Sequence, residues 1–281
     1  MHFASYLSIL SVLGASGSGV LAWAPPNYDG YRLVWSDAFP GSPGQSPDEG
    51  RWNIITGNLG VNNELEVYTR DSRNVQMSGG DTLQLVPWLD GSTWTSGRIE
   101  SKYTFTPTAG GRTMAEGQIR FGSNDPSTKQ GIWPAFWLLG DSIRNGTPWP
   151  DCGELDILET VNGLLTGYGT AHCSTCNEPI GRGGSIGIPN QDWQRWRIVW
   201  DLTNGDWRAQ TITWFMNDQQ FHQLSGATIG DQGVWTALTN RPLFFILNVA
   251  VGGNWPGYPN DRTQGGWGAM MEVGYVAHYS T

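Results

Sequence analysis

Short runs of apolar and β-branched residues, interrupted by many of the chain's 39 Gly and 16 Pro, set the pattern of this sequence. Several runs alternate polar with apolar residues, as half-buried strands do. No long stretch shows helical periodicity, although residues 228–238 fit one short helix. Many short strands with frequent turns predict an all-β sandwich or jelly roll. The clearest strands are expected at residues 31–35, 82–86, 196–200, 211–215 and 243–247.

The stretch 154–159 is unusual for a strand because three of its residues are acids, which strands disfavour. Side chains alternate along a strand, so Glu154 and Asp156 share one face and the apolar residues between them point to the other. Glu159 stands an odd number of positions after Glu154 and would turn to the apolar face. A β-bulge within Ile157-Leu158 would bring Glu159 back beside the other acids, and bulges recur next to active sites. We therefore predict a bulge here.

Acids crowded on one strand face repel and desolvate one another, which separates their pKa values. Glycosidic bond cleavage uses such a separation, because one carboxyl must be protonated while another is ionised at the same pH. For cleavage with retained configuration we expect the two carboxyls to lie about 5–5.5 Å apart. Taken alone, the stretch also fits a half-buried strand that simply turns its acids toward water.

The charge balance narrows the choice of partner. The chain has a net charge of −9, a pI near 4.8 and only 16 Lys and Arg. This balance argues against nucleic acid and membranes as partners and suits a neutral polysaccharide. The 16 Trp residues make a sugar-stacking surface plausible in addition to their use in the core. We expect the protein to be a monomer.

Residues 1–22 have the pattern of a secretory signal peptide. An apolar core at 6–13 and small residues at 14–19 precede a cleavage motif that ends at Ala22, although no Lys or Arg comes before the core. No other apolar run reaches the roughly 18 residues of a membrane span. We therefore expect residues 23–281 to form a single catalytic domain that is secreted to the extracellular space.

Three cysteines, Cys152, Cys173 and Cys176, lie near the acidic stretch. In a secreted chain an odd number predicts one disulfide and one free thiol. A hairpin that reverses at Asn162-Gly163 would place Cys152 opposite Cys173, within one residue. We therefore expect Cys152 to pair with Cys173 or Cys176, with a Cys173–Cys176 bridge as the alternative. The sequon at 145–147 predicts glycosylation of Asn145 in a surface loop.

The hexapeptide Glu-Leu-Asp-Ile-Leu-Glu at 154–159 resembles the catalytic signature of glycoside hydrolase family 16 in its longer, bulged form. Other segments match the same family in its usual order, and together they cover almost the whole of residues 23–281. The resemblance implies a concanavalin-like β-jelly roll of two curved antiparallel sheets, with a glycan cleft across the concave sheet. The matching segments are residues 33–37, 62–69, 96–99, 131–139, 169–172, 246–257 and 271–276.

The resemblance also implies retaining endo-hydrolysis of β-linked glucans without a cofactor. Carried over by position, Glu154 is the nucleophile, Glu159 is the general acid/base, and Asp156 holds the charge state of Glu154. The strand pattern by itself does not say which Glu attacks. No metal is expected at this site. A structural calcium ion is compatible with the fold, although no loop shows a metal-ligand spacing.

Other residues are candidates for binding substrate. Aromatic rings among them could stack on sugars, and the polar groups could hydrogen-bond to sugar hydroxyls. Each has a structural alternative, which is core packing for the rings and turn or sheet stabilisation for the polar groups. His172 could instead contact one of the acids. The candidates are Asn63, Glu64, Arg98, Trp133, Trp137, His172, Asn248 and Trp255.

The odd spacing from Glu154 to Glu159 resembles the laminarinase-like branch of the family. This favours β-1,3-glucan or mixed β-1,3/1,4-glucan as the substrate. An endo-β-1,3-galactanase is the alternative among hydrolases, because loops select axial or equatorial hydroxyls. Two other classes stay open. A cell-wall glucan transglycosylase would use the same acids while excluding water, and a non-catalytic lectin would keep the aromatic rings but could lose the acids.

Overall fold

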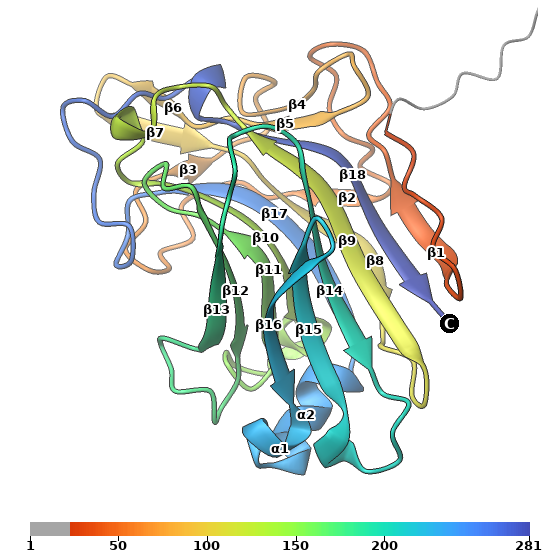
Figure 1. Cartoon of the computed structure of the whole chain (residues 1–281). Coiled ribbons are helices and arrows are strands. Elements are labelled where there is room, and N and C mark those ends of the chain that lie inside the picture. Colours follow the sequence, from red (N-terminus) through yellow and green to blue (C-terminus); the bar gives the residue numbers. More distant parts are fainter. Residues whose placement is uncertain (1–22) are drawn as a thin grey trace, which may run out of the picture.

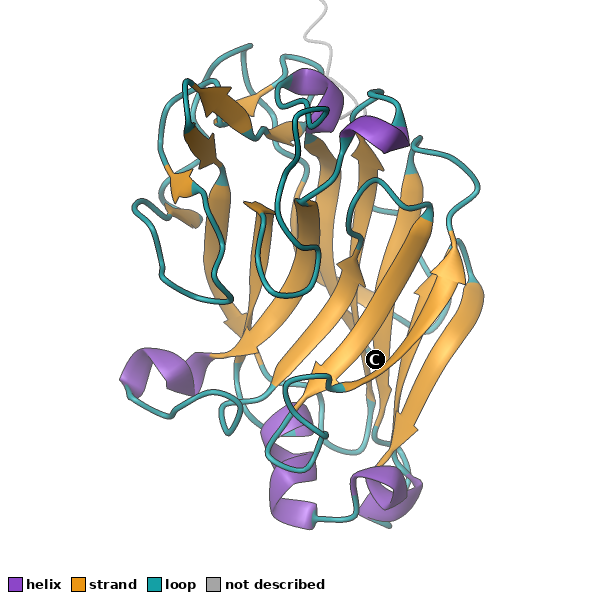
Figure 2. Ribbon diagram, turned by 90° about the vertical axis from the view of Figure 1, so that its left-hand side faces the viewer, coloured by secondary structure: helices purple, strands orange, loops and turns teal. Residues whose placement is uncertain are grey.

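The computed structural model describes residues 23–281, so the predicted signal peptide lies outside the described residues. Two large antiparallel sheets pack face to face (Figures 1 and 2). The β-jelly roll predicted from the sequence is confirmed. Within residues 23–281, no helix is both long and apolar enough to cross a membrane.

The first sheet has eight strands, and it contains four of the five strands predicted most clearly. Its strands are β1 (Arg32–Asp37), β4 (Val75–Met77), β5 (Leu83–Leu85), β9 (Arg112–Phe121), β14 (Gln194–Asp201), β15 (Thr211–Met216), β16 (Gln219–Ser225) and β18 (Met271–Ser280). They lie in the order β16-β15-β14-β9-β18-β5-β4, and β1 pairs with β18. Strand β14 shows strict alternation of buried and half-buried residues, as its sequence predicts.

The second sheet has seven strands and holds the acidic stretch near its centre. Its strands are β2 (Trp52–Ile54), β8 (Arg98–Phe105), β10 (Ile132–Gly140), β11 (Glu154–Glu159), β12 (Thr166–His172), β13 (Arg182–Gly187) and β17 (Leu243–Val251). Their order is β13-β12-β11-β10-β17-β8-β2. A small third sheet joins β3 (Val67–Tyr68), β7 (Thr93–Ser96) and β6 (Trp88–Asp90).

The space between the two large sheets is filled mainly by large apolar side chains. Fully buried rings come from both sheets, among them Trp52, Trp196, Trp214, Phe136 and Phe245. Removing one such side chain from water contributes about 2–3 kcal/mol to folding. The aromatic core therefore packs against the second sheet, which carries the acids.

Two short helices replace the single helix expected at residues 228–238. They are α1 (Gly226–Ile229) and α2 (Gln232–Thr239), and they lie together at one end of the sandwich (Figure 1). Gly230 adopts a left-handed conformation with φ of 82°, which ends α1. The carboxylate of Asp231 then accepts from the backbone N–H of Val234 and starts α2. The one-helix prediction was wrong because this Gly-Asp pair combines a stop and a start signal. Four 3₁₀ turns complete the elements of residues 23–281: η1 (Pro126–Thr128), η2 (Asp141–Asn145), η3 (Trp207–Ala209) and η4 (Trp267–Ala269).

Candidate active site

Strand β11 contains the predicted bulge. Along the neighbouring strand β12, Thr170 lies opposite Asp156 and Tyr168 lies opposite Glu159. Three steps along β11 therefore match two steps along β12. The ladder between β11 and β10 shifts at the same place. The extra residue lies within Ile157-Leu158, so the prediction of a bulge there is confirmed.

The bulge keeps the three acids together because it turns two consecutive apolar residues inward. Leu155, Ile157 and Leu158 are all fully buried in the core between the sheets. Glu154, Asp156 and Glu159 form an acid cluster on the other face of the second sheet. Side chains two residues apart on a regular strand share a face, and the bulge extends this relation to an odd spacing.

A tryptophan from the first sheet supports the bulge from inside the core. The buried Trp214 of β15 donates its indole N–H to the backbone carbonyl of Asp156 at 2.8 Å. Trp214 reaches this carbonyl because position 169 on β12 is a glycine. A Cβ at Gly169 would lie only 2.4 Å from Cδ1 of Trp214. The small residue on β12 and the large one on β15 thus fit together directly under the acid cluster.

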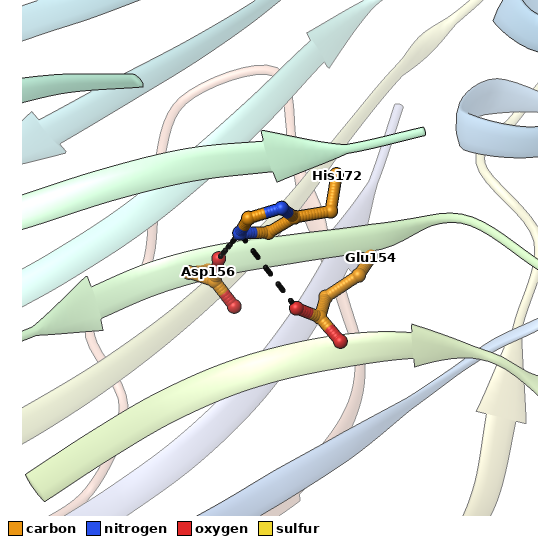
Figure 3. Close-up of side chains that lie close together, drawn as sticks. All are labelled: Glu154, Asp156 and His172. Atoms are coloured by element: carbon orange, nitrogen blue, oxygen red, sulfur yellow. Dashed lines mark ion pairs between the residues drawn. The ribbon is translucent and has the colours of Figure 1, made fainter. Parts of the chain in front are cut away.

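His172 of β12 lies against two of the acids. Figure 3 shows its ring between Glu154 and Asp156, with Nε2 turned toward both carboxylates. Nε2 is 3.4 Å from Oδ2 of Asp156 and 3.9 Å from Oε1 of Glu154. The pairing of β11 with β12 places His172 directly opposite Glu154. Of the two roles considered for His172, the structure thus shows the contact with the acids.

An aromatic group surrounds the third acid. Trp133 of β10 donates its indole N–H to Oε1 of Glu159 at 2.9 Å. The ring of Trp255 packs edge-on against Trp133, with 5.4 Å between centroids, and also against Tyr168 of β12. Trp255 is 45% exposed. The group therefore offers an accessible indole beside Glu159, where a sugar ring could stack.

Three more candidates form a polar group next to Trp133 along β10. Trp137 donates its indole N–H to Oδ1 of Asn248 at 2.8 Å, and the Asn248 amide donates to the hydroxyl of Tyr68 at 3.1 Å. The guanidinium of Arg98 lies over the ring of Trp137 at 5.1 Å and pairs with Glu100. The structure thus brings Trp137, Asn248 and Arg98 together through direct contacts.

The last two candidates tie two loops to each other. Asn63 donates its amide N–H to Asn254 at 2.7 Å, and Glu64 forms a backbone bridge with Gly252. These contacts fasten the loop before β3 to the loop after β17 that carries Trp255. Burial and the charge of Glu66 raise the pKa of Glu64 to about 8. Structural roles are therefore evident for both residues, and their contact with substrate stays a prediction.

The three acids differ in how their charge is compensated. Burial raises the pKa of Glu154 to about 8, the charge of Asp156 adds to this, and the cations His172 and Arg98 oppose it. Burial also raises the pKa of Asp156, against a hydrogen bond and charge from His172. Burial and the charge of Asp156 raise the pKa of Glu159 well above its ordinary value, and the indole of Trp133 opposes this. Within residues 23–281 His172 forms ion pairs with Glu154 and Asp156 but not with Glu159, and the raised pKa of Glu159 suits a general acid.

The same side chains have the spacing of a metal site but not its charge state. One ligand atom each from Glu154, Asp156 and His172 lies within 4.8 Å of the others. Burial would lower the pKa of His172, but its hydrogen bond with Asp156 and the nearby negative charges raise it to about 10. A metal needs the neutral imidazole. A metal ion at this cluster would therefore have to displace a proton from His172.

The preferred disulfide prediction was wrong. Cys173 pairs with Cys176, and Cys152 is a free, buried thiol. Cys152 packs with Leu139, Phe244 and Ile246, whereas Cys173 and Cys176 belong to the main core. Cys152 and Cys173 therefore belong to different buried clusters and do not face each other. The bridge given as the alternative is the one that forms.

Three further residues contact the predicted ones and were not predicted from the sequence. Tyr168 could have been found, because it alternates with Thr170 and His172 along the strand paired with β11. Trp149, in the loop before β11, lies with its ring 5.7 Å from that of His172. Glu178, in the loop after β12, hydrogen-bonds to His172. No local pattern marks the last two, because both reach the site from loops. The predicted glycosylation site Asn145 is exposed at the end of η2.

A β-sandwich with clustered carboxylates on one sheet face and an exposed indole beside them fits one class of protein, the carboxylate-dependent glycoside hydrolases. A family model described as an XgeA-like, catalytic GH16 domain matches residues 88–181. The chain is 31% identical to a β-glucanase of Rhodothermus marinus over 89% of this chain and 85% of that protein. A glucan endo-1,3-β-glucosidase of Cryptopygus antarcticus is 28% identical over 93% and 96% of the respective chains.

The chain also shares its fold with a solved structure. The crystal structure of an endo-1,3-β-glucanase from Streptomyces sioyaensis superimposes with a TM-score of 0.85 and 34% identity, over 92% of this chain and 99% of that one. The chain therefore belongs to glycoside hydrolase family 16, as the resemblance of its hexapeptide predicted.

Proposed function

We propose that this enzyme is a retaining endo-hydrolase of β-1,3-glucan or mixed β-1,3/1,4-glucan. The observation that carries the proposal is the bulge in β11, which places all three acids on one face of the second sheet. The substrate class is supported by the names of the relatives from Rhodothermus marinus and Cryptopygus antarcticus and of the Streptomyces sioyaensis structure.

In the first step, Glu154 attacks the anomeric carbon of a glucosyl unit. Glu159 gives its proton to the glycosidic oxygen, the bond to the leaving sugar breaks, and a glycosyl-enzyme ester forms on Glu154. The raised pKa of Glu159 keeps this proton in place when Glu154 ionises. His172 and Arg98 stabilise the ionised form of Glu154.

In the second step, Glu159 removes a proton from water, and this water attacks the anomeric carbon. The ester to Glu154 breaks and the product leaves with its original configuration. The negative charge of Asp156 raises the pKa of Glu154 and the pKa of Glu159. It thereby helps Glu159 to keep its proton until the first step.

The substrate assignment can be tested by incubating the purified protein with laminarin, lichenan, β-galactan and cellulose and sizing the products. We expect short oligosaccharides from laminarin or lichenan at early times. Early oligosaccharide products that grow longer with time would instead indicate transglycosylation. Release from galactan alone would contradict the glucan assignment.

The two glutamates can be assigned by azide rescue of alanine variants on an aryl β-glucoside of suitable length. In Glu154→Ala, azide replaces the nucleophile and should give an α-glycosyl azide. In Glu159→Ala, azide replaces the water of the second step and should give a β-glycosyl azide. Glu49→Gln, at an exposed ion pair with Arg70, is the control and should be fully active. Exchanged stereochemistry would reverse the assignment.

The setting of the enzyme is also part of the proposal. We infer secretion after removal of residues 1–22, action as a monomer, and a glycan on Asn145. The exposure of Asn145 supports its glycosylation, and the small number of Lys and Arg residues supports action on a neutral polymer. Mass spectrometry of the secreted protein would show Trp23 as the first residue and a glycan in the peptide that holds Asn145.

A further inference from the structure

Glu178 is a charged residue that touches the active site from outside the catalytic strand. It lies in the loop between β12 and β13 and is largely shielded from solvent. Its Oε2 is 2.6 Å from Nδ1 of His172. Its Oε1 accepts from the backbone N–H of Cys173 at 2.9 Å. Both carboxylate oxygens are therefore engaged, and the side chain has one defined orientation.

This contact decides what His172 presents to the acids. When Nδ1 donates to Glu178, the other ring nitrogen faces Asp156 and Glu154 (Figure 3). Oδ2 of Asp156 is buried, and within residues 23–281 no donor other than His172, whose Nε2 is 3.4 Å away, lies close enough to compensate its charge. A rotated His172 would leave that oxygen buried without compensation, which is costly.

The loop that carries Glu178 is closed by a disulfide. Cys173 follows His172 directly and is bridged to Cys176, and both are buried in the core. The backbone N–H of Cys176 also donates to the carbonyl of Cys173 at 2.9 Å. The bridge therefore fixes the turn that brings Glu178 back over His172, and Cys173 supplies the N–H that holds the carboxylate.

We propose that Glu178 is a positioning residue of the reaction: its carboxylate holds His172 against Asp156 and Glu154, and the Cys173–Cys176 disulfide holds Glu178 in place. The proposal deepens the proposed function and rests on it for its effect on catalysis. The coupling between Glu178 and His172 does not depend on the substrate. The titratable groups that face His172 are Glu154 and Asp156 from β11 and Glu178 from the loop.

The expected effect on catalysis follows from the role of His172. Its charge opposes the repulsion between Glu154 and Asp156 and so favours an ionised Glu154. Loss of a residue that orients a functional side chain from behind costs about 10–100-fold in activity at metal sites, and we expect a similar loss here. The loss should appear in kcat and leave KM nearly unchanged, because Glu178 acts through His172.

The first measurement is the NMR titration of the His172 imidazole in the full secreted protein, assigned with a His172→Gln variant. Glu178→Gln keeps the size of the side chain but removes its charge, and should lower the pKa of His172 by about one unit. Glu49→Gln is the control and should leave the titration unchanged. An unchanged titration in Glu178→Gln would overturn the proposal, even if the glucan assignment also proved wrong.

The second measurement is kinetic, on the glucan that the wild-type enzyme cleaves. Glu178→Gln and Glu178→Ala should lower kcat about 10–100-fold with little change in KM. Wild-type kcat in both variants would refute the role in catalysis while leaving the proposed hydrolase function intact. A double variant, Cys173→Ser with Cys176→Ser, should shift the His172 titration in the same direction as Glu178→Gln. A wild-type titration in a folded double variant would show that the disulfide does not position Glu178.

Discussion

The hydrogen bond from Trp133 to Glu159 should set the alkaline limit of activity. The indole N–H is 2.9 Å from the carboxylate and favours its charged form, so it lowers the pKa of Glu159 against the effect of burial. Trp133→Phe removes the donor and keeps an aromatic ring. A hydrogen bond to a charged group contributes about 1.5–3 kcal/mol, which corresponds to about 1–2 pKa units. The pKa of Glu159 should therefore rise by about one unit or more.

The assay is the pH dependence of kcat/KM, whose alkaline limb reports loss of the general-acid proton in the free enzyme. The limb should move to higher pH in Trp133→Phe, whatever happens to the absolute rate. Trp137→Phe is the matched control, because Trp137 stands on the same strand but donates to Asn248. Its alkaline limb should stay in place. If the limb in Trp133→Phe also stays in place while the rate falls, then either the hydrogen bond or the role of Glu159 is misassigned.

Two further predictions concern stability. Burial lowers the pKa of His278 to about 4, below the ordinary 6.5 of the unfolded chain, so the unfolded state binds the proton more tightly. The free energy of unfolding should therefore fall by about 3 kcal/mol as the pH falls from above 6.5 toward 4. The variant His278→Phe should show a smaller difference between the free energies of unfolding measured in urea at pH 7 and at pH 4. The variant also removes the contact with Tyr103. Gly169→Ala should lower the free energy of unfolding by about 1–3 kcal/mol, because the new methyl group overlaps Trp214. Thermal denaturation would measure this, and an unchanged Tm would contradict the close fit under the acid cluster.

The position of the acids could be predicted because strand geometry is local. Alternation places Glu154 and Asp156 on one face, and the mismatch of Glu159 requires one extra residue between them. The disulfide was harder to predict because it depends on which buried cluster each cysteine joins. The ladder pairs Glu154 with His172, so Cys173, the next residue, turns away from the face that His172 shares with the acids. Counting residues along the hairpin, without asking on which face of the sheet each cysteine lies, therefore gives the wrong disulfide partner for Cys173.

The residues around the acids also differ in whether they could be predicted from the sequence. Trp133 and Trp137 lie an even number of positions apart on β10, and this alternation places both on the face of the acid cluster. Glu178 reaches His172 only because a short disulfide loop folds back over the end of β12. Neither periodicity nor composition predicts that this loop folds back over His172, because the fold-back depends on contacts that form only in the folded chain. Catalytic side chains on strands were therefore predictable here, whereas the loop residue that orients them became visible only in three dimensions.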